Sequence, residues 1–188
     1  ELYRCPRCSG ELTLLYDYKG LAQRHDWQET WGTGKTLWER FTPLLPPIAS
    51  SAVVTLGEGN TPLVKSRYLG RLLGLKELYF KLDLCNPTGS FKDRQIAIAF
   101  CKAIEWGHRA FGIASSGNAG VALAAYCAKA GTQANVWASR EVPASKLHQI
   151  QIYGARLFLL PDPKASGDML AYYAAYTQMQ EFCLAHCT

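Results

Sequence analysis

The stretch AFGIASSGNAGVALAAYCAKAGTQANVWA, residues 110–138, decides the fold. It opens with a short apolar run over 110–114, continues with a longer helix-forming segment over 118–130, and closes with a second apolar run over 134–138. Gly131 follows the longer segment, at the position where a helix commonly ends in a left-handed residue. The order strand, helix, strand is typical of the unit that builds a parallel sheet.

The same alternation continues on both sides of this stretch. Further strands are predicted over 78–81 and 156–160, and further helices over 90–106, 145–153 and 167–185. Together these elements predict an α/β domain with a parallel sheet and helices on both faces. Ligands bind beyond the carboxyl ends of the strands in such sheets. The loops 82–90 and 115–118 are therefore the predicted site.

Composition and charge narrow the class of protein. The 188 residues are 48% hydrophobic and 19% charged, which is ordinary for a globular chain. The net charge of +5 arises after residue 50, and its Lys and Arg residues are scattered along the chain rather than gathered in runs. We therefore expect small anions and not nucleic acid as ligands. No stretch approaches the roughly 18 apolar residues of a membrane-spanning helix. We expect a cytoplasmic protein without a membrane partner.

Two regions differ in pattern along the chain. Residues 1–52 are rich in Trp and close with several prolines, which extend the backbone and oppose helix, so they are predicted to form an amino-terminal arm. Residues 53–188 carry the alternating pattern. Because the chain begins at Glu1 rather than Met and stops inside a helical pattern, we expect it to be part of a longer protein.

A pair of cysteines, Cys5 and Cys8, has the spacing of half a zinc knuckle. A structural zinc ion needs four ligands, and His25 is the one nearby candidate for a third. We therefore predict a degenerate, metal-free knuckle, with zinc ligation by the two cysteines as the alternative. The total of seven cysteines is odd, so a disulfide framework is not expected.

The segment NPTGSFKDR, residues 86–94, combines a strand break with a helix start. Its Pro and Gly interrupt the preceding strand, and Ser90 with Asp93 has the spacing of a capping box that begins a helix at Phe91. Lys92 then lies in the first turn, where the helix dipole disfavours an ammonium group and helps to expose a nucleophilic amine. A solvated helix start on the surface is the alternative interpretation.

Residues 114–120, ASSGNAG, follow a predicted strand and open a predicted helix. Their backbone amides and hydroxyl groups converge at the helix start, an arrangement that suits an anion or a polar ring. The same residue types also make a good strand-to-helix turn without any ligand.

The string NPTGSFKDR resembles the cofactor-lysine motif of the fold-type II (tryptophan synthase beta-like) pyridoxal-phosphate enzymes, and in this full form it is similar to the threonine synthases. The segments GEGNTPL, residues 57–63, and WERFTPLLPP, residues 38–47, are similar to the same family. The resemblance implies pyridoxal 5'-phosphate as the cofactor and Lys92 as its covalent anchor. Gln95 departs from the Gly that is usual in the family; we expect its side chain to tighten local packing without touching Lys92.

The resemblance also implies roles for the residues around the lysine. Phe91 is expected to pack near the cofactor ring, and Asn118 to form a hydrogen bond with the phenolic oxygen of the cofactor. Contacts with the substrate, its carboxylate above all, are expected from the remaining residues of the two loops: Thr88, Ser115, Ser116 and Gly117.

The implied reaction is the conversion of O-phospho-L-homoserine and water to L-threonine and phosphate, with Lys92 also moving protons. Two alternatives stay open. One is another lyase of the same fold type, namely a threonine or serine dehydratase or a cysteate synthase, and the other is a non-catalytic relative.

The resemblance covers only about the first half of the family, so residues 53–188 correspond to the amino-terminal part of a truncated catalytic domain. The loop expected to hold the cofactor phosphate and the residue facing the pyridine nitrogen are not in the chain. We therefore expect these residues alone to bind the cofactor weakly and to be inactive. The expected partners are a small amino-acid substrate and, from the family, a second copy in a homodimer.

Overall fold

The computed structural model describes residues 5–24, 34–115 and 117–160, together with the helical residues Ala174, Thr177 and Glu181. The chain divides into two compact units, Glu1–Pro47 and Ile48–Thr188. The division lies slightly before the boundary at 52 that the composition suggests.

The first unit contains the short helices α1 (Tyr18–Arg24) and α3 (Leu37–Phe41), followed by a 3-10 turn over Thr42–Leu44. Thr36 precedes α3 in an extended conformation, and its hydroxyl accepts a hydrogen bond from the Glu39 backbone N–H at 3.2 Å. The Glu39 carboxylate accepts one from the Lys35 backbone N–H in return. This reciprocal arrangement satisfies amides that the helix start leaves unpaired.

Cys5 and Cys8 lie in a tight turn of the first unit. The Cys5 backbone N–H donates to the Gly10 carbonyl at 2.8 Å, and the Ser9 N–H donates to the Cys5 carbonyl at 2.8 Å. Hydrogen bonds from the backbone of Arg7 and Cys8 lower the pKa of the Cys5 thiol. Among the residues with described positions, no three His, Cys, Asp or Glu side chains gather as a metal site requires. His25 lies outside those residues, and the metal-free knuckle stays a prediction.

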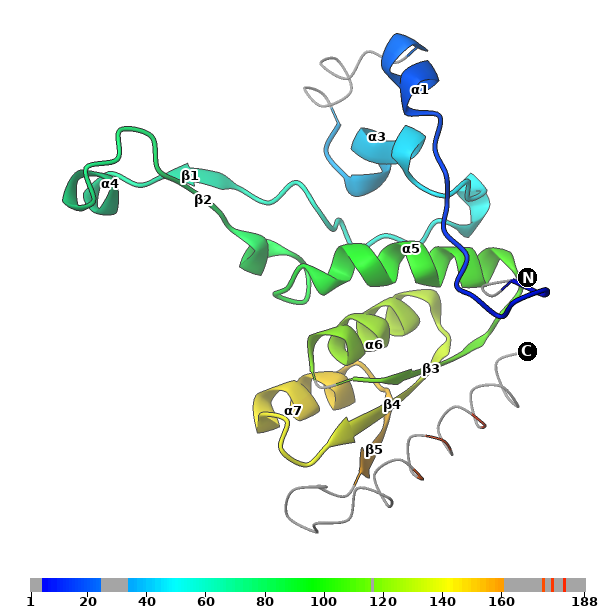
Figure 1. Cartoon of the computed structure of the whole chain (residues 1–188). Helices are drawn as coiled ribbons and strands as arrows, with labels where there is room; N and C mark the ends of the chain where they lie inside the picture. Colours follow the sequence, from blue (N-terminus) through cyan, green and yellow to red (C-terminus); the bar gives the residue numbers. More distant parts are fainter. Residues whose placement is uncertain are drawn as a thin grey trace. The chain divides into compact units, whose positions relative to one another are not determined.

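The second unit contains the predicted parallel sheet (Figure 1). Strands β3 (Ala110–Ala114), β4 (Gln133–Ser139) and β5 (Arg156–Leu160) lie in the order β3-β4-β5 and pair in parallel. The connecting helices are α6 (Asn118–Ala130) and α7 (Ala144–Ile152). Because parallel crossovers are right-handed, both helices lie on the same face of the sheet. The prediction of an α/β domain with a parallel sheet is confirmed, while a helix on the other face of the sheet stays a prediction.

The core of this unit lies between α6, the sheet and α5 (Lys92–Glu105). The ring of Phe100 on α5 is 4.5 Å from that of Phe111 on β3 and 5.9 Å from that of Tyr126 on α6, measured between centroids. The buried Cys101 thiol forms two hydrogen bonds with the backbone of Val54. It accepts one from the Val54 N–H at 3.2 Å and donates one to the Val54 carbonyl at 3.3 Å. Helix α5 is thereby fixed against α6 and against the segment before residue 57.

The predicted strand over 78–81 forms, but its place in the parallel sheet was wrongly predicted. As β2 (Tyr79–Lys81) it pairs antiparallel with β1 (Leu63–Lys65) in a separate two-stranded sheet. Helix α4 (Tyr68–Leu72) lies in the connection between these two strands. A nearby antiparallel partner needs only a short connection, whereas parallel pairing requires a long crossover. The sequence analysis predicted no strand at residues 63–65, because it assigned Leu63 to the motif GEGNTPL.

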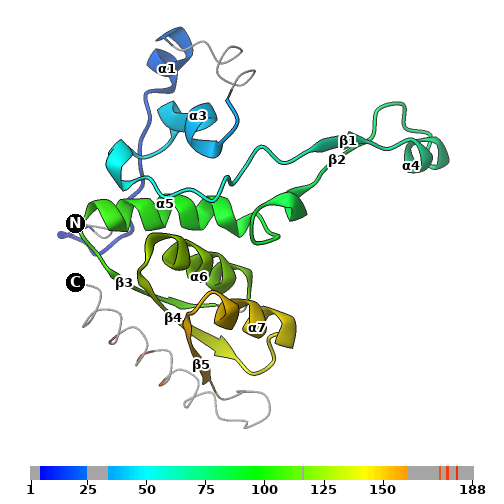
Figure 2. The same ribbon diagram turned by 180° about the vertical axis from the view of Figure 1, so that it is seen from behind.

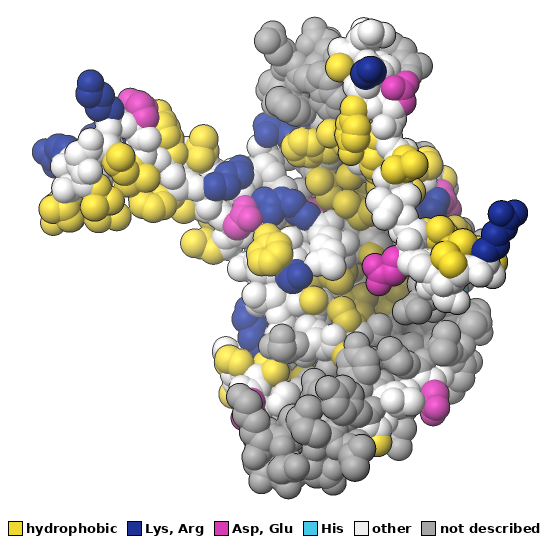
Figure 3. Space-filling model, viewed as in Figure 1, with side chains coloured by type: hydrophobic (Ala, Val, Ile, Leu, Met, Phe, Trp, Pro, Cys, Tyr) yellow, Lys and Arg dark blue, Asp and Glu magenta, His cyan; other side chains and the backbone are white. Residues whose placement is uncertain are grey.

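Hydrophobic side chains remain exposed along this hairpin, residues 63–81 (Figure 3). A two-stranded sheet has little stability alone. The exposed residues are Leu63, Val64, Tyr68, Leu69, Leu72, Leu73, Leu75, Tyr79 and Phe80.

Two short 3-10 turns complete the described elements, at Ser50–Ala52 and Asp83–Cys85. The helix predicted over 167–185 falls outside the described residues except for the three named above. In the described part of the chain, no helix is both long and apolar enough to cross a membrane.

Candidate active site around Lys92

Lys92 lies in the first turn of α5, as the sequence predicts, and its side chain is half-buried. Its Nζ atom donates a hydrogen bond to Gln95 Oε1 at 2.9 Å. The same atom lies 5.0 Å from the centroid of the Phe91 ring, and Phe91 itself is exposed. The expectation that Gln95 does not touch Lys92 was therefore wrong: residues three apart on a helix share a face.

The capping box predicted from Ser90 and Asp93 forms only in part. The Ser90 hydroxyl accepts a hydrogen bond from the Lys92 backbone N–H at 3.2 Å. The Asp93 carboxylate, however, turns to Thr88: it accepts from the Thr88 backbone N–H at 2.8 Å and from the Thr88 hydroxyl. Helix α5 accordingly begins at Lys92, one residue later than the capping box implies.

Asp93 is completely buried, and Thr88 is almost so. Burial raises the pKa of the Asp93 carboxyl, and the nearby charge of Glu58 adds to this, while the hydrogen bonds from Thr88 oppose it. The Thr88 hydroxyl, expected at the substrate, is engaged by Asp93 in this structure. Its clear contribution is to close the loop that carries Lys92.

The loop is also joined to GEGNTPL. The Gly59 backbone N–H donates to the buried Asn86 Oδ1 at 3.0 Å, and the Thr61 hydroxyl donates to Asp83 Oδ1 at 3.1 Å. Arg94, on the first turn of α5, completes the junction by donating two hydrogen bonds to Asp83, at 2.7 and 3.1 Å. The two segments that resemble the family thus form one polar unit.

The opposite charges of Arg94 and Asp83 stabilise each other in this junction. The Arg94 guanidinium lowers the pKa of the Asp83 carboxyl, chiefly through their hydrogen bonds, and Asp83 raises the pKa of Arg94.

Deeper in the unit, the fully buried Glu58 carboxylate accepts hydrogen bonds from the Thr55 hydroxyl at 2.9 Å and from the Leu56 N–H at 3.0 Å. Burial, and then the neighbouring Glu58, raise the pKa of the Tyr126 phenol far above its ordinary value.

The second predicted loop, 115–118, follows the carboxyl end of β3, where ligands bind in parallel sheets. The Ser115 hydroxyl accepts hydrogen bonds from the backbone N–H groups of Gly117, at 3.2 Å, and Gly120, at 2.9 Å. Gly117 has a φ of 150° and a ψ of −94°, which only glycine adopts readily. Asn118 begins α6 with an exposed side chain, and Ser116 lies outside the described residues.

The two loops come together at one end of the second unit. Helices α5 and α6 pack against each other, and Figures 1 and 2 show their amino-terminal ends on the same side, next to α7. Lys92 and Asn118 occupy these two ends. The lysine loop does not follow a strand of the parallel sheet, contrary to expectation, but a 3-10 turn after β2.

Helix α7 contacts both loops, which the sequence interpretation did not predict. Gln149 Nε2 donates to the Thr88 carbonyl at 3.4 Å. Lys146, one turn earlier on the same face, has its Cγ atom 3.9 Å from the position that a Cβ would take on Gly117. The spacing of Lys146 and Gln149 is a helical i, i+3 pair, the one sequence signal that would have placed both at a common surface.

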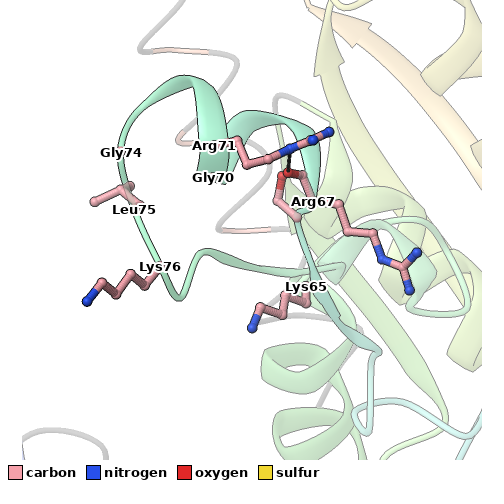
Figure 4. A pocket seen from close by; sticks show the side chains of 8 residues that line it. Lys65, Arg67, Gly70, Arg71, Gly74, Leu75 and Lys76 are labelled. Atoms are coloured by element: carbon pink, nitrogen blue, oxygen red, sulfur yellow. Dashed lines mark hydrogen bonds between the residues drawn. The ribbon is translucent and has the colours of Figure 1, made fainter.

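A separate cavity of about 690 Å³ lies at the turn of the hairpin and does not include Lys92 (Figure 4). Four cationic residues line it: Lys65, Arg67, Arg71 and Lys76. The two lysines extend to one side of the hairpin, whereas Arg71 turns back to the Arg67 carbonyl, to which its Nε donates at 3.2 Å. The cations therefore do not converge on a single point.

Comparison with known proteins identifies the family of this chain. Residues 54–186 match the family described as pyridoxal-phosphate dependent enzymes. The chain is 38% identical, over 83% of its length, to the threonine synthase of Methanocaldococcus jannaschii, and 42% identical, over 66% of its length, to that of a Synechocystis species. It spans 38% and 33% of these two relatives.

Among solved structures, the chain is similar to O-ureido-L-serine synthase, with a TM-score of 0.56 and 25% identity. The similarity covers 72% of this chain and 42% of that one. The matched family region includes both loops, Lys92 and the parallel sheet. The chain belongs to the pyridoxal-phosphate dependent enzyme family, and its sheet and helices are those of fold type II.

Proposed function

We propose that this chain supplies the cofactor lysine and one side of the substrate pocket of a threonine synthase, which converts O-phospho-L-homoserine and water to L-threonine and phosphate. The observation that carries the proposal is the position of Lys92, whose amine stands at the start of α5 within a loop held rigidly by Asp93 and Asn86. The relatives named threonine synthase support this substrate over others used by the same fold.

The surroundings of Lys92 fit a cofactor that bonds covalently to an amine. In the described structure the amine contacts a neutral amide and an aromatic face, and no described carboxylate pairs with it. A reacting lysine needs an amine that is not fixed in an ion pair with a carboxylate, and these surroundings meet that condition. When bound, pyridoxal phosphate supplies an electron sink for negative charge on the substrate carbon atoms.

The family resemblance supports the following roles for the chain's own residues. Lys92 holds the cofactor and, once released from it, takes and returns a proton at its Nζ atom. Asn118 donates a hydrogen bond to the phenolic oxygen, and Phe91 covers the ring. Ser115, Ser116 and Gly117 bind the carboxylate of the substrate. Thr88 shapes the loop through Asp93, and its own contact with the substrate stays a prediction.

The test is an assay of the full-length protein with O-phospho-L-homoserine. We expect phosphate and threonine in equal amounts, and neither product from Lys92→Ala. Release of ammonia and a keto acid from threonine or serine, without phosphate release, would instead assign a dehydratase. A protein that forms no product from any of these substrates would be the non-catalytic relative.

The 188 residues alone span about a third of the relatives' length, so we propose that they bind the cofactor weakly and do not turn over substrate. A cytoplasmic homodimer stays an expectation of the family resemblance.

A further inference from the structure

The most specific contact of the candidate active site is between Lys92 and Gln95. The Nζ atom of Lys92 donates to Gln95 Oε1 at 2.9 Å, from one helical turn away on α5. Gln95 is exposed and Lys92 is half-buried, so the amide lies at the solvent side of the amine.

The charged neighbours of Lys92 are engaged elsewhere. The carboxylate of Asp93 is buried against Thr88, and Arg94 is paired with Asp83. The remaining contact of the amine is the face of the Phe91 ring, 5.0 Å from Nζ. Among the described residues, Gln95 is therefore the one hydrogen-bonding side chain that fixes where the amine stands.

An amide differs from the alternatives at this position in a way that suits a reacting lysine. Its oxygen accepts a hydrogen bond from an ammonium or an amine, and its NH2 group can donate to the lone pair of a neutral amine. A carboxylate only accepts, and its charge favours the ammonium form. Glycine offers no side-chain partner. Among these three, glutamine alone offers a hydrogen-bonding side chain that carries no charge to favour one protonation state.

We propose that Gln95 is a positioning residue for Lys92, which keeps the lysine amine in place in both protonation states whenever the amine is not bonded to the cofactor. The inference rests on the proposed role of Lys92 as the cofactor anchor. It adds a residue that governs where the amine of this lysine lies when it returns to its bond with the cofactor.

The first test measures the reactivity of Lys92 in the 188-residue chain, with neither cofactor nor substrate present. The chain is methylated reductively with isotopic formaldehyde at low conversion, from pH 6 to pH 10, and Lys92 is quantified by peptide mass spectrometry against Lys129 of the same molecules. The variants are Gln95→Glu, Gln95→Met and, as a matched charge change on α7, Gln151→Glu.

We expect Gln95→Glu to slow Lys92 labelling about twofold near neutral pH, the effect of one helix-surface ion pair, and to move its pH profile upward. Gln95→Met should change the labelling rate of Lys92 without moving its pH profile upward, because it removes the acceptor without adding charge. Gln151→Glu should match the wild type. Equal Lys92 labelling in all four proteins, or parallel changes at Lys129, would overturn the proposal.

The second test uses the full-length enzyme. We expect Gln95→Met to lower kcat about fivefold, the value of one hydrogen bond, with KM unchanged, and Gln95→Glu to shift the pH profile of kcat upward. A change in KM alone would overturn the positioning role. If the enzyme proves inactive on O-phospho-L-homoserine, the proposed function fails, but the labelling result still decides the role of Gln95.

Discussion

Asp93 and Thr88 close the loop that carries Lys92: the Thr88 backbone N–H and hydroxyl each donate to one oxygen of the Asp93 carboxylate. The turn between them passes through Gly89, which has a φ of 82°. Lys92 precedes Asp93 directly, so the buried carboxylate on one side of the helix start sets the direction of the amine on the other. The first prediction tests this contact.

Replacing Asp93 by Asn is expected to preserve both contacts, because the amide oxygen accepts from the Thr88 N–H and the amide NH2 donates to the Thr88 hydroxyl. The free energy of unfolding should stay within about 1 kcal/mol of the wild type at neutral pH, since no buried charge remains to be desolvated. Asp93→Ala leaves the Thr88 N–H without a partner and should cost about 1–3 kcal/mol. Urea unfolding measures both.

The pH dependence of this contact has a definite sign. Burial raises the pKa of Asp93 in the folded state, so the folded protein binds this proton more tightly than the unfolded chain does. The contribution of Asp93 to stability is therefore greatest below the ordinary carboxyl pKa of about 3.9 and falls as pH rises towards the raised pKa. The difference in stability between wild type and Asp93→Asn should fall in the same direction. A difference that rises with pH would contradict the assignment.

The ion pair between Arg94 and Asp83 is predicted to behave in the opposite way. The Arg94 guanidinium lowers the pKa of Asp83, so the stabilisation is present above the ordinary carboxyl pKa and is lost as pH falls through the lowered one. Both side chains are partly exposed, and we expect about 1 kcal/mol or less from the pair. A double-mutant cycle of Arg94→Lys and Asp83→Asn, measured at pH 7 and again in acid, gives the coupling.

The coupling should be positive at pH 7 and vanish in acid. The Arg94→Lys variant keeps the positive charge but cannot bind both carboxylate oxygens of Asp83 at once. It therefore distinguishes the effect of the two-pronged hydrogen bonding from the effect of the charge. A coupling that persists unchanged in acid would show that the pair acts through packing alone.

Gly120 on α6 is predicted to be intolerant of a side chain. A Cβ atom there would lie 2.8 Å from Val136 Cγ1 on β4 and 3.3 Å from the Ser115 Cβ. Valine has little rotational freedom to withdraw, so Gly120→Ala should cost about 1–3 kcal/mol through overpacking. Thermal unfolding of Gly120→Ala, Val136→Ala and the double variant tests this. The double variant should recover part of the loss; strictly additive losses would contradict the contact.

The sequence predicts the elements of the second unit better than the contacts between them. Strand β3, helix α6 and strand β4 appear within one residue of the ranges read from 110–138, because apolar periodicity and Gly131 define them locally. The position of Lys92 in the first turn of α5 is likewise a local property. For the same reason the loop at 115–118 was placed correctly beyond β3.

The partners of individual side chains could not be predicted in this way. Asp93 has the sequence spacing to cap at Ser90, but the backbone path through Gly89 brings Thr88 within its reach instead. Helix α7 reaches the site only because the parallel crossover returns it beside α6, a relationship between residues far apart in the sequence. Such contacts depend on how loops turn, which hydrophobic periodicity does not encode.

The most direct test of the account is to locate the bond between pyridoxal phosphate and the protein. The full-length protein is incubated with pyridoxal phosphate, reduced with borohydride and digested, and the modified peptide is identified by mass spectrometry. We predict a phosphopyridoxyl group on Lys92, at near one equivalent, which disappears in Lys92→Ala while Lys102→Ala on the same helix retains it. Modification spread over several lysines, or undiminished in Lys92→Ala, would contradict Lys92 as the cofactor anchor.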